Sequence, residues 1–391
     1  MSKTSLNTKE YKYGLTGAKK KLGINYWRFF FHGVEALSGA EQMFFIELEM
    51  LNPWTSPSDV QLGFKPRINL TADDLQYALA GTQSATNLNT ETIVQPSYCS
   101  LRVGMLGSSA KQICHYFPLK DIKFNARPFE IQIGNKLFSD SKLTGFLSLS
   151  QEDNTAHPEY FCDSGYASWD LSYIIDTQST DGYDGATCRW FPEGLHASFT
   201  GKISFDGNDY LVDARRCNGY IERMWGDKTP EPWFHLSTSN LTSVITGKTL
   251  FNSSFAVQGS FEDRLSFIGN FEDIEIKLCA DGGKRHYTAI WDCSQMPESN
   301  EPENNQLHWS VSLANKTWVI DIDVYCKIKE LYNRQLELPE GERKVLNLLE
   351  GATGTGEIKL YKKIGPTLEQ IEHAKLAKVV CEFGHNEDGE V

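Results

Sequence analysis

Between residues 189 and 235 the chain carries the motifs RWFP (189–192), FDGND (205–209), GYIERMWGD (219–227) and PWFH (232–235). Aromatic side chains fit the pleated surface of a β-strand, and Asp-Gly is a favoured two-residue turn between antiparallel strands. The stretch therefore predicts a β-hairpin that turns at Asp206 and Gly207, followed by further aromatic-rich extended segments.

This order of motifs resembles the tocopherol cyclase-like family. In that family a Trp-x-Pro segment, a β-hairpin, a Gly-Tyr-x-Glu-x-x-Trp-Gly box and a Trp-Phe pair follow one another. The segment YWRFFFHG at 26–33 is also similar to the aromatic opening of the family. An acidic residue of the family pattern is replaced near Phe31 or His32, so no role of that acid is carried over. Members of the family are similar to two lipocalin-like β-domains packed against each other, and the resemblance implies this architecture here.

Alternating apolar residues are the dominant pattern elsewhere in the chain. Trp318, Ile320 and Ile322 place apolar side chains on one face of a strand, and Asn315 with Lys316 forms a turn before it. Many short strands with such turns favour an antiparallel barrel or sandwich over alternating strands and helices. We expect an all-β protein of two antiparallel lipocalin-like barrels or sandwiches packed together.

One helix is expected near the C-terminus, between residues 366 and 380. Leu368, Ile371, Leu376 and Val379 lie roughly on one helical face there. The polar, glycine-bearing segment at 176–186 is the best candidate for a linker. It predicts an N-terminal lipocalin-like β-domain at 1–185 and a C-terminal one at 186–391.

Composition excludes several classes of function. The 38 basic and 51 acidic residues give a net charge of −13, which opposes binding to nucleic acid or to an anionic membrane surface. No apolar run approaches the roughly 18 residues needed to span a bilayer, and no signal peptide is recognisable, so we expect a cytoplasmic protein without stable membrane insertion. The nine cysteines are scattered singly, and metalloprotease, hydrolase and phosphate-loop motifs are absent, so no metal or cofactor is expected.

The box at 219–227 carries the candidate chemistry. Tyr220 and Glu222 are two residues apart, so their side chains share one face of an extended segment. Trp225 and Asp227, further along the chain, are also two residues apart and would likewise point to one side. A carboxyl group among aromatic rings loses water, which raises its pKa toward the range of a general acid. The alternative is structural: Glu222 pairs with Arg223 or another basic residue at a domain junction.

Trp233 and His235 are two residues apart on the next predicted strand, so their side chains point to the same face. An imidazole beside an indole could serve acid–base chemistry, although such a histidine is more often a satisfied core residue. Under the catalytic interpretation that the resemblance implies, Glu222 or Asp227 is the acid, and Tyr220 and His235 orient the substrate or relay the proton. The substrate wall is then formed by Trp190, Trp225 and Trp233, together with Trp27.

Three functions fit these observations. The resemblance implies a cofactor-independent cyclase, isomerase or hydratase, that is, a tocopherol cyclase-like isomerase or lyase. It would act by acid catalysis on an apolar, prenylated or polyene, small molecule in a cavity between the two β-domains. The second function is a non-catalytic carrier or sensor of a hydrophobic ligand in the same cavity. The third is a purely structural or protein-interaction role, which leaves the aromatic box unexplained.

Overall fold

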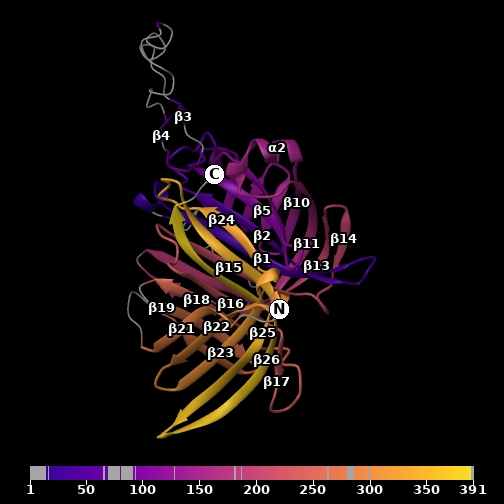
Figure 1. Ribbon diagram of the computed structural model, residues 1–391, viewed down its shortest axis with the longest axis vertical. Coiled ribbons are helices and arrows are strands. Elements are labelled where there is room, and N and C mark those ends of the chain that lie inside the picture. Colours follow the sequence, from indigo (N-terminus) through magenta and orange to yellow (C-terminus); the bar gives the residue numbers. More distant parts are fainter. Residues whose placement is uncertain are drawn as a thin grey trace.

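The computed structural model describes residues 15, 17–64, 67–68, 80, 91–92, 94–126, 128–179, 182–185, 187–261, 264–279, 286–297 and 300–388. Within them the chain is almost entirely β-structure, arranged as two large curled sheets that lie one above the other along the long axis of the molecule (Figure 1). All strand pairs are antiparallel. The described helical segments are short: η1 (Gly17–Lys20), η3 (Leu119–Asp121), α2 (Gln151–Ala156), η4 (Pro158–Tyr160), η5 (Pro302–Asn304) and η6 (Ile328–Glu330).

The first sheet has 13 strands and runs in the order β6-β5-β2-β1-β14-β13-β11-β10-β9-β8-β7, with β12 and β15 paired alongside. A separate small pair is formed by β3 (Arg67–Ile68) and β4 (Glu91–Thr92). The strands of the first sheet are β1 (Ile24–Glu35), β2 (Glu41–Leu51), β5 (Tyr98–Leu106), β6 (Lys111–Phe117), β7 (Ile122–Ala126), β8 (Phe129–Ile133), β9 (Lys136–Ser139), β10 (Lys142–Leu149), β11 (Gly165–Gln178), β12 (Tyr183–Asp184), β13 (Cys188–Phe205), β14 (Asn208–Val212) and β15 (Asn218–Gly226).

The second sheet has 11 strands in the order β20-β19-β18-β16-β26-β25-β23-β22-β21, with β17 paired to β26 and β24 paired to β25. Its strands are β16 (Trp233–Thr238), β17 (Leu241–Ser243), β18 (Ser254–Phe261), β19 (Arg264–Phe271), β20 (Ile274–Leu278), β21 (Thr288–Gln295), β22 (Gln306–Ala314), β23 (Trp318–Lys327), β24 (Tyr332–Glu337), β25 (Lys344–Ile364) and β26 (Thr367–Asp388).

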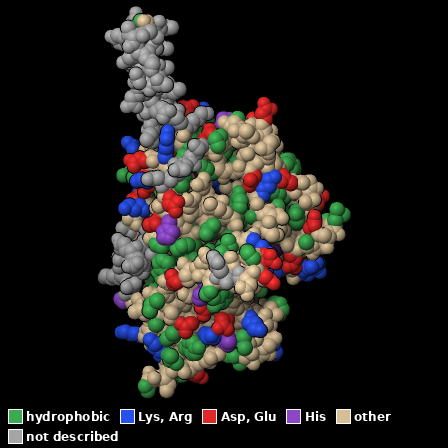
Figure 2. All heavy atoms as spheres, in the orientation of Figure 1, with side chains coloured by type: hydrophobic (Ala, Val, Ile, Leu, Met, Phe, Trp, Pro, Cys, Tyr) green, Lys and Arg blue, Asp and Glu red, His purple; other side chains and the backbone are tan. Residues whose placement is uncertain are grey.

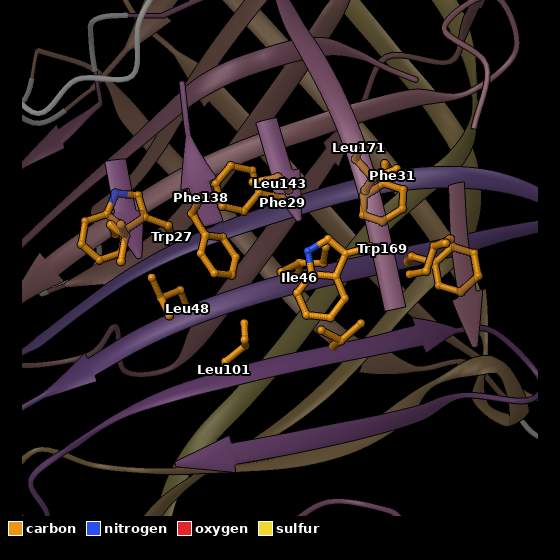
Figure 3. Packing of buried hydrophobic residues seen from close by; sticks show 14 of the residues in the cluster. Trp27, Phe29, Phe31, Ile46, Leu48, Leu101, Phe138, Leu143, Trp169 and Leu171 are labelled. Atoms are coloured by element: carbon orange, nitrogen blue, oxygen red, sulfur yellow. The ribbon is translucent and has the colours of Figure 1, made fainter. Parts of the chain in front are cut away.

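Each sheet curls around a hydrophobic core of its own, and a third apolar cluster lies between the sheets. Side chains of a strand point alternately to its two faces, so neighbouring residues of β1 serve different cores. Trp27 and Phe29 point into the first core, where Figure 3 shows them near Leu48 and Phe138. Tyr26 belongs instead to the cluster between the sheets. Any side chain that β1 contributes to this junction must therefore lie on the same face of the strand as Tyr26.

The predicted hairpins are confirmed. Asp206 and Gly207 join β13 to β14 and both have positive φ angles, 48° and 85°, as a tight hairpin turn requires. Asn315 and Lys316 lie between the paired strands β22 and β23, and Ile320 and Ile322 are buried in the second core as the alternation predicted. The all-β class and the two packed antiparallel sheets are likewise confirmed.

The predicted C-terminal helix is wrong, because residues 367–388 form the strand β26, which pairs with β25 along almost its whole length. The pairing is interrupted by register shifts at Gly351/Gly354, Gly354/Gly356 and Leu360/Tyr361, and Lys378 has a positive φ of 51°. Such bulges change the face of the strand to which the following residues point. They therefore interrupted the alternation of apolar and polar residues by which a strand is recognised. The GATGTG segment at 351–356 lies within β25.

The chain passes from the first sheet to the second between β15 and β16. Residues 188–226, assigned from the sequence to the C-terminal domain, belong to the first sheet, and the predicted linker at 176–186 lies partly outside the described residues. Division of the chain into two independently folding domains stays a prediction.

Two leucines of β26 distinguish the strand from the predicted helix. Leu376 lies in the second core with 3% of its surface exposed, whereas Leu368 is 55% exposed. We expect Leu376→Ala to lower the free energy of unfolding by about 2–5 kcal/mol. Leu368→Ala should change it by less than about 0.5 kcal/mol. Urea unfolding of both variants is the measurement, and equal losses would contradict this strand assignment.

Candidate functional site

Arg28 is buried between the two sheets and faces carboxylates from both of them. On the first sheet it is flanked in register by Glu47 of β2 and Glu222 of β15. On the second sheet Glu350 of β25 and Glu382 of β26 are paired with each other. Because cross-strand neighbours project from the same face, each sheet presents its charged side chains as a row toward the other sheet. We call these residues, with Glu49, Arg102 and Arg334, the junction cluster.

The guanidinium of Arg28 contacts all four carboxylates. Its Nε lies 3.0 Å from Glu47, Nη1 lies 3.2 Å from Glu222, and Nη2 lies 2.8 Å from both Glu350 and Glu382. Burial alone would lower the pKa of Arg28, but the carboxylates, Glu382 foremost, raise it well above its usual value. Arg28 is therefore a permanent cation at the contact between the sheets.

Two further arginines extend the junction cluster. Arg334 of β24 donates to Glu350 at 2.5 Å, to Glu47 at 3.0 Å and to the amide oxygen of Gln112 at 3.0 Å. Arg102 of β5 donates to Glu47 at 3.0 Å and to Glu49 at 2.8 Å. Glu47 is thus held by three guanidinium groups.

Glu222 is fully buried and accepts hydrogen bonds from three aromatic side chains. The indole of Trp190 donates to it at 2.8 Å, the hydroxyl of Tyr220 at 2.9 Å and the hydroxyl of Tyr26 at 3.3 Å. Trp233 makes an equivalent bond to Glu382 at 2.6 Å. Each sheet therefore contributes one carboxylate to which a tryptophan donates.

His235 lies beside this group on β16. Its Nδ1 is 2.8 Å from the side-chain oxygen of Gln258 and 3.8 Å from a carboxylate oxygen of Glu222. Its Nε2 is 3.0 Å from the hydroxyl of Ser237. Both ring nitrogens have polar neighbours, so the imidazole is fixed in orientation.

The buried carboxyl groups outnumber the guanidinium groups. Unpaired charge is costly to bury, so a surplus of buried carboxyls is expected to hold protons. Burial raises the pKa of Glu49 and of Glu350, in agreement with that expectation. Burial acts on Glu47 as well, but Arg334, Arg28 and Arg102 outweigh it and lower its pKa to about 2. The count is five carboxyls (Glu47, Glu49, Glu222, Glu350, Glu382) against three guanidiniums (Arg28, Arg102, Arg334).

A small cavity adjoins the junction cluster. Tyr26 and Trp233 line one part of it, and Glu337, at the end of β24, lines another. About 10 Å³ is open to the centre of a water-sized sphere, which is room for about one water molecule. Glu337 is 5% exposed, and burial raises its pKa to about 8. A carboxyl group that is protonated at neutral pH thus faces the cavity. The remaining lining residues are Ile24, Arg28, Glu47, Glu49, Thr229, Leu336, Leu338 and Leu346.

The structure brings together five of the eight residues singled out in the sequence: Tyr220, Glu222, His235, Trp190 and Trp233. They meet in a polar, hydrogen-bonded cluster rather than around a large apolar cavity. The structural alternative for Glu222, pairing with a basic residue at the junction, is realised by Arg28. The hydrogen bonds of His235 likewise match the alternative of a satisfied core histidine.

The other three residues lie elsewhere. Asp227 follows β15, and its side chain, 30% exposed, pairs with Lys19 at 3.4 Å. Trp225 stacks on Phe191 with ring centroids 5.2 Å apart. Both have the parity opposite to Glu222, and because β15 is uninterrupted, that parity carries them away from the junction.

Trp27 also faces away from the junction. It lies in the first core (Figure 3). There it packs against Phe124 and Phe129, and the guanidinium of Arg223 lies 4.9 Å from its ring. Its neighbour Arg28 has the junction-facing parity instead. Trp27 is therefore a core residue and not part of the site.

Sequence reasoning missed the arginines of the junction cluster and the glutamates Glu47, Glu350, Glu382 and Glu337. Arg28 stood inside the quoted aromatic segment at 26–33, but only the aromatic residues there were interpreted. A usable signal was present: Glu350 in LNLLEGA and Glu382 in VVCEFG are lone carboxylates inside apolar runs. A charge at such a position is rarely buried unless it is paired.

Comparison with known proteins gives distant structural likenesses only. No protein-family profile and no curated protein sequence matches the chain. Kievitone hydratase from Nectria haematococca overlaps 98% of this chain and 97% of its own at 12% identity, with a TM-score of 0.41. CghA overlaps 95% and 90% at 9% identity, with a TM-score of 0.43. A putative AttH from Nitrosomonas europaea overlaps 94% of each chain at 10% identity, with a TM-score of 0.38. The resemblance to the tocopherol cyclase-like family stays a prediction.

The described residues contain neither a candidate membrane helix nor a candidate metal centre. None of the described helices is long and apolar enough to cross a membrane. Among the same residues, no group of three or more His, Cys, Asp or Glu side chains is placed to hold a metal ion. Figure 2 shows acidic and basic side chains interspersed on the visible surface, whereas the junction cluster is buried.

Removing the cation of Arg28 should destabilise the fold. Arg28→Met leaves four buried carboxyl groups without their shared partner, and we expect a loss of about 3–5 kcal/mol in the free energy of unfolding at pH 7. The loss should shrink toward pH 4.5, because the carboxyl groups can then take up protons. Arg215→Met, which removes an exposed arginine paired with Asp213, is the control and should have no measurable effect. Equal urea midpoints for the two variants would contradict the role of Arg28.

Because of Glu337, the folded protein should lose stability as the pH rises. Its pKa is raised to about 8 in the folded protein, so the folded state holds the proton more tightly than the unfolded state. Its contribution to the free energy of unfolding is fully present below pH 4.5, the usual pKa of a glutamate in the unfolded chain. The contribution is lost as the pH rises through 8, at up to about 1.4 kcal/mol per pH unit. Glu337→Gln should therefore gain stability relative to the wild type between pH 5 and pH 9 in urea unfolding. A constant difference across that range would show that Glu337 does not titrate in this way.

Proposed function

We propose that the protein is an acid–base enzyme of cyclase, isomerase or hydratase type, acting on an apolar small molecule between the two sheets. One observation carries the proposal. Glu337, a carboxyl group that holds its proton at neutral pH, lines a cavity beside the junction cluster together with the aromatic rings of Tyr26 and Trp233. A buried carboxylic acid that is neutral at pH 7 is the group that protonates an alkene or a carbonyl oxygen.

In this proposal Glu337 donates the proton to the substrate. The positive charge that develops on the substrate faces the rings of Tyr26 and Trp233, whose π faces attract cations. Tyr26 also donates to Glu222, so a proton released from the substrate can pass through the Tyr26 hydroxyl to Glu222. Glu337 then regains a proton from water when the cavity reopens. Tyr220 and Trp190 donate to the other carboxylate oxygen of Glu222, and His235 lies beside that same oxygen, so Glu222 is held in place.

The cavity has to enlarge before such a substrate can bind, because it now holds about one water molecule. Its wall is formed by Leu336, Glu337 and Leu338 of the β24 segment and by Thr229 in the connection between the sheets. We infer that these two segments separate to admit the substrate. Closure afterwards excludes bulk water from a reactive cation.

A carrier or sensor of a hydrophobic ligand is the second candidate. It is favoured by the two polar neighbours of His235 and by the four donors around Glu222, since groups so fully paired serve well as rigid support. In that case the junction cluster would only shape the wall of the cavity, and no bond of the ligand would change.

Deuterium transfer separates the two candidates. Purified protein is incubated in D₂O with a mixed extract of prenylated phenols and polyenes, and the products are examined by mass spectrometry. An acid-catalysed cyclisation, isomerisation or hydration places a solvent deuteron on carbon, so the enzyme should yield a product with this label. We expect Glu337→Gln to abolish labelling and Glu222→Gln to reduce it by about 10²–10⁴-fold.

The matched control is Asp227→Asn, which alters the carboxylate that lies outside the junction. It should leave labelling unchanged. Ligand that co-purifies with the protein but never gains deuterium would identify a carrier. Full labelling by both glutamine variants would exclude Glu337 as the acid and Glu222 as the proton acceptor.

A further inference from the structure

A second concave site lies on the first sheet, apart from the junction cluster. It is a groove at one end of β7, β8 and β9 with about 440 Å³ open to the centre of a water-sized sphere. Three lysines line it: Lys120 of η3, Lys123 of β7 and Lys136 of β9. Asp121 is the single acidic residue among the described residues that line the groove. The groove is therefore basic although the whole chain has a net charge of −13.

Lys136 occupies a position that its strand pairing would assign to a core residue. It is paired with Ile133 across β8 and β9, so both side chains project from the face that encloses the first core. Only 9% of the surface of Lys136 is exposed. Gly145 of β10 leaves room for its stem, because a Cβ added there would lie 3.1 Å from Cγ of Lys136. The chain thus makes space to bring a lysine from the barrel wall into the groove.

The ammonium group of Lys136 has aromatic neighbours and, among the described residues, no acidic partner. Its Nζ lies 5.3 Å from the ring centre of Phe117 and 4.9 Å from that of Phe146. Within the described parts of the chain, no side chain forms an ion pair or hydrogen bond with it. Burial lowers the pKa of Lys136, so the charge is held at a cost that an incoming anion would offset.

We propose that this groove binds a small organic anion, a carboxylate or phosphate group on an apolar stem. Lys136 contacts the anionic group, and the exposed lysines Lys120 and Lys123 draw it in from solution. Phe117 and Ile133 line the same groove and contact the apolar stem. The site is independent of the acid chemistry proposed at the junction, since it shares no residue with it.

Calorimetric titration with three probes of equal stem length tests the proposal: nonanoate, octyl phosphate and octan-1-ol. Both anions should bind saturably and the neutral alcohol should bind at least tenfold more weakly, and the tighter of the two anions identifies the headgroup. Lys136→Met should weaken anion binding about tenfold or more, since it removes a charged hydrogen-bond donor while keeping the stem. Lys136→Arg should retain binding within about threefold, because it keeps the charge.

Lys316→Met removes an exposed lysine in the turn between β22 and β23, and it is the matched control for net charge. It should leave anion affinity unchanged. Folding is checked by urea unfolding, and Lys136→Met should be at least as stable as the wild type because it removes a desolvated charge. Unchanged anion affinity in folded Lys136→Met, equal binding of octan-1-ol, or no saturable binding of either anion at millimolar concentration would each overturn the proposal.

Discussion

The contact between Arg28 and four carboxylates is the interaction on which the relation between the two sheets depends. Arg28 receives Glu47 and Glu222 from its own sheet and Glu350 and Glu382 from the other. Strand register fixes which charged residues lie side by side within each sheet. The charged row of one sheet can therefore match the charged row of the other in only a few relative placements. Apolar packing around the junction is less selective, because hydrophobic contacts carry no direction.

Buried ion pairs are weak evidence for stability, since the cost of removing charges from water offsets much of their attraction. The junction cluster is better understood as a device for alignment. A shift of one residue along β26 would replace Glu382 by an apolar neighbour and leave Arg28 with a lost partner. We infer that the charges select one relative placement of the sheets, while the three apolar clusters supply most of the favourable free energy.

Local features of the fold could be predicted from the sequence, and long-range ones could not. The hairpin at Asp206 and Gly207 and the shared face of Tyr220 and Glu222 follow from patterns a few residues long. The partner of Arg28 at Glu382 is 354 residues away, so no local pattern reports it. Bulges near Gly354 explain why β26 was mistaken for a helix. Trp225 and Asp227 were grouped with Glu222 because they are close to it in sequence. They are an odd number of residues away from Glu222, however, so on a strand they point to the opposite face.

Within the cavity, environment rather than residue type separates the roles of the carboxyl groups. Glu47 and Glu337 line the same small space, yet three guanidiniums lower the pKa of Glu47 to about 2, while burial raises that of Glu337 to about 8. Near neutral pH one is an anion and the other a neutral acid, the kind of separation by which enzymes assign acid and charge-stabilising roles to chemically identical groups. The arginines that align the sheets therefore also separate the ionisation states of the two carboxyl groups that face the cavity.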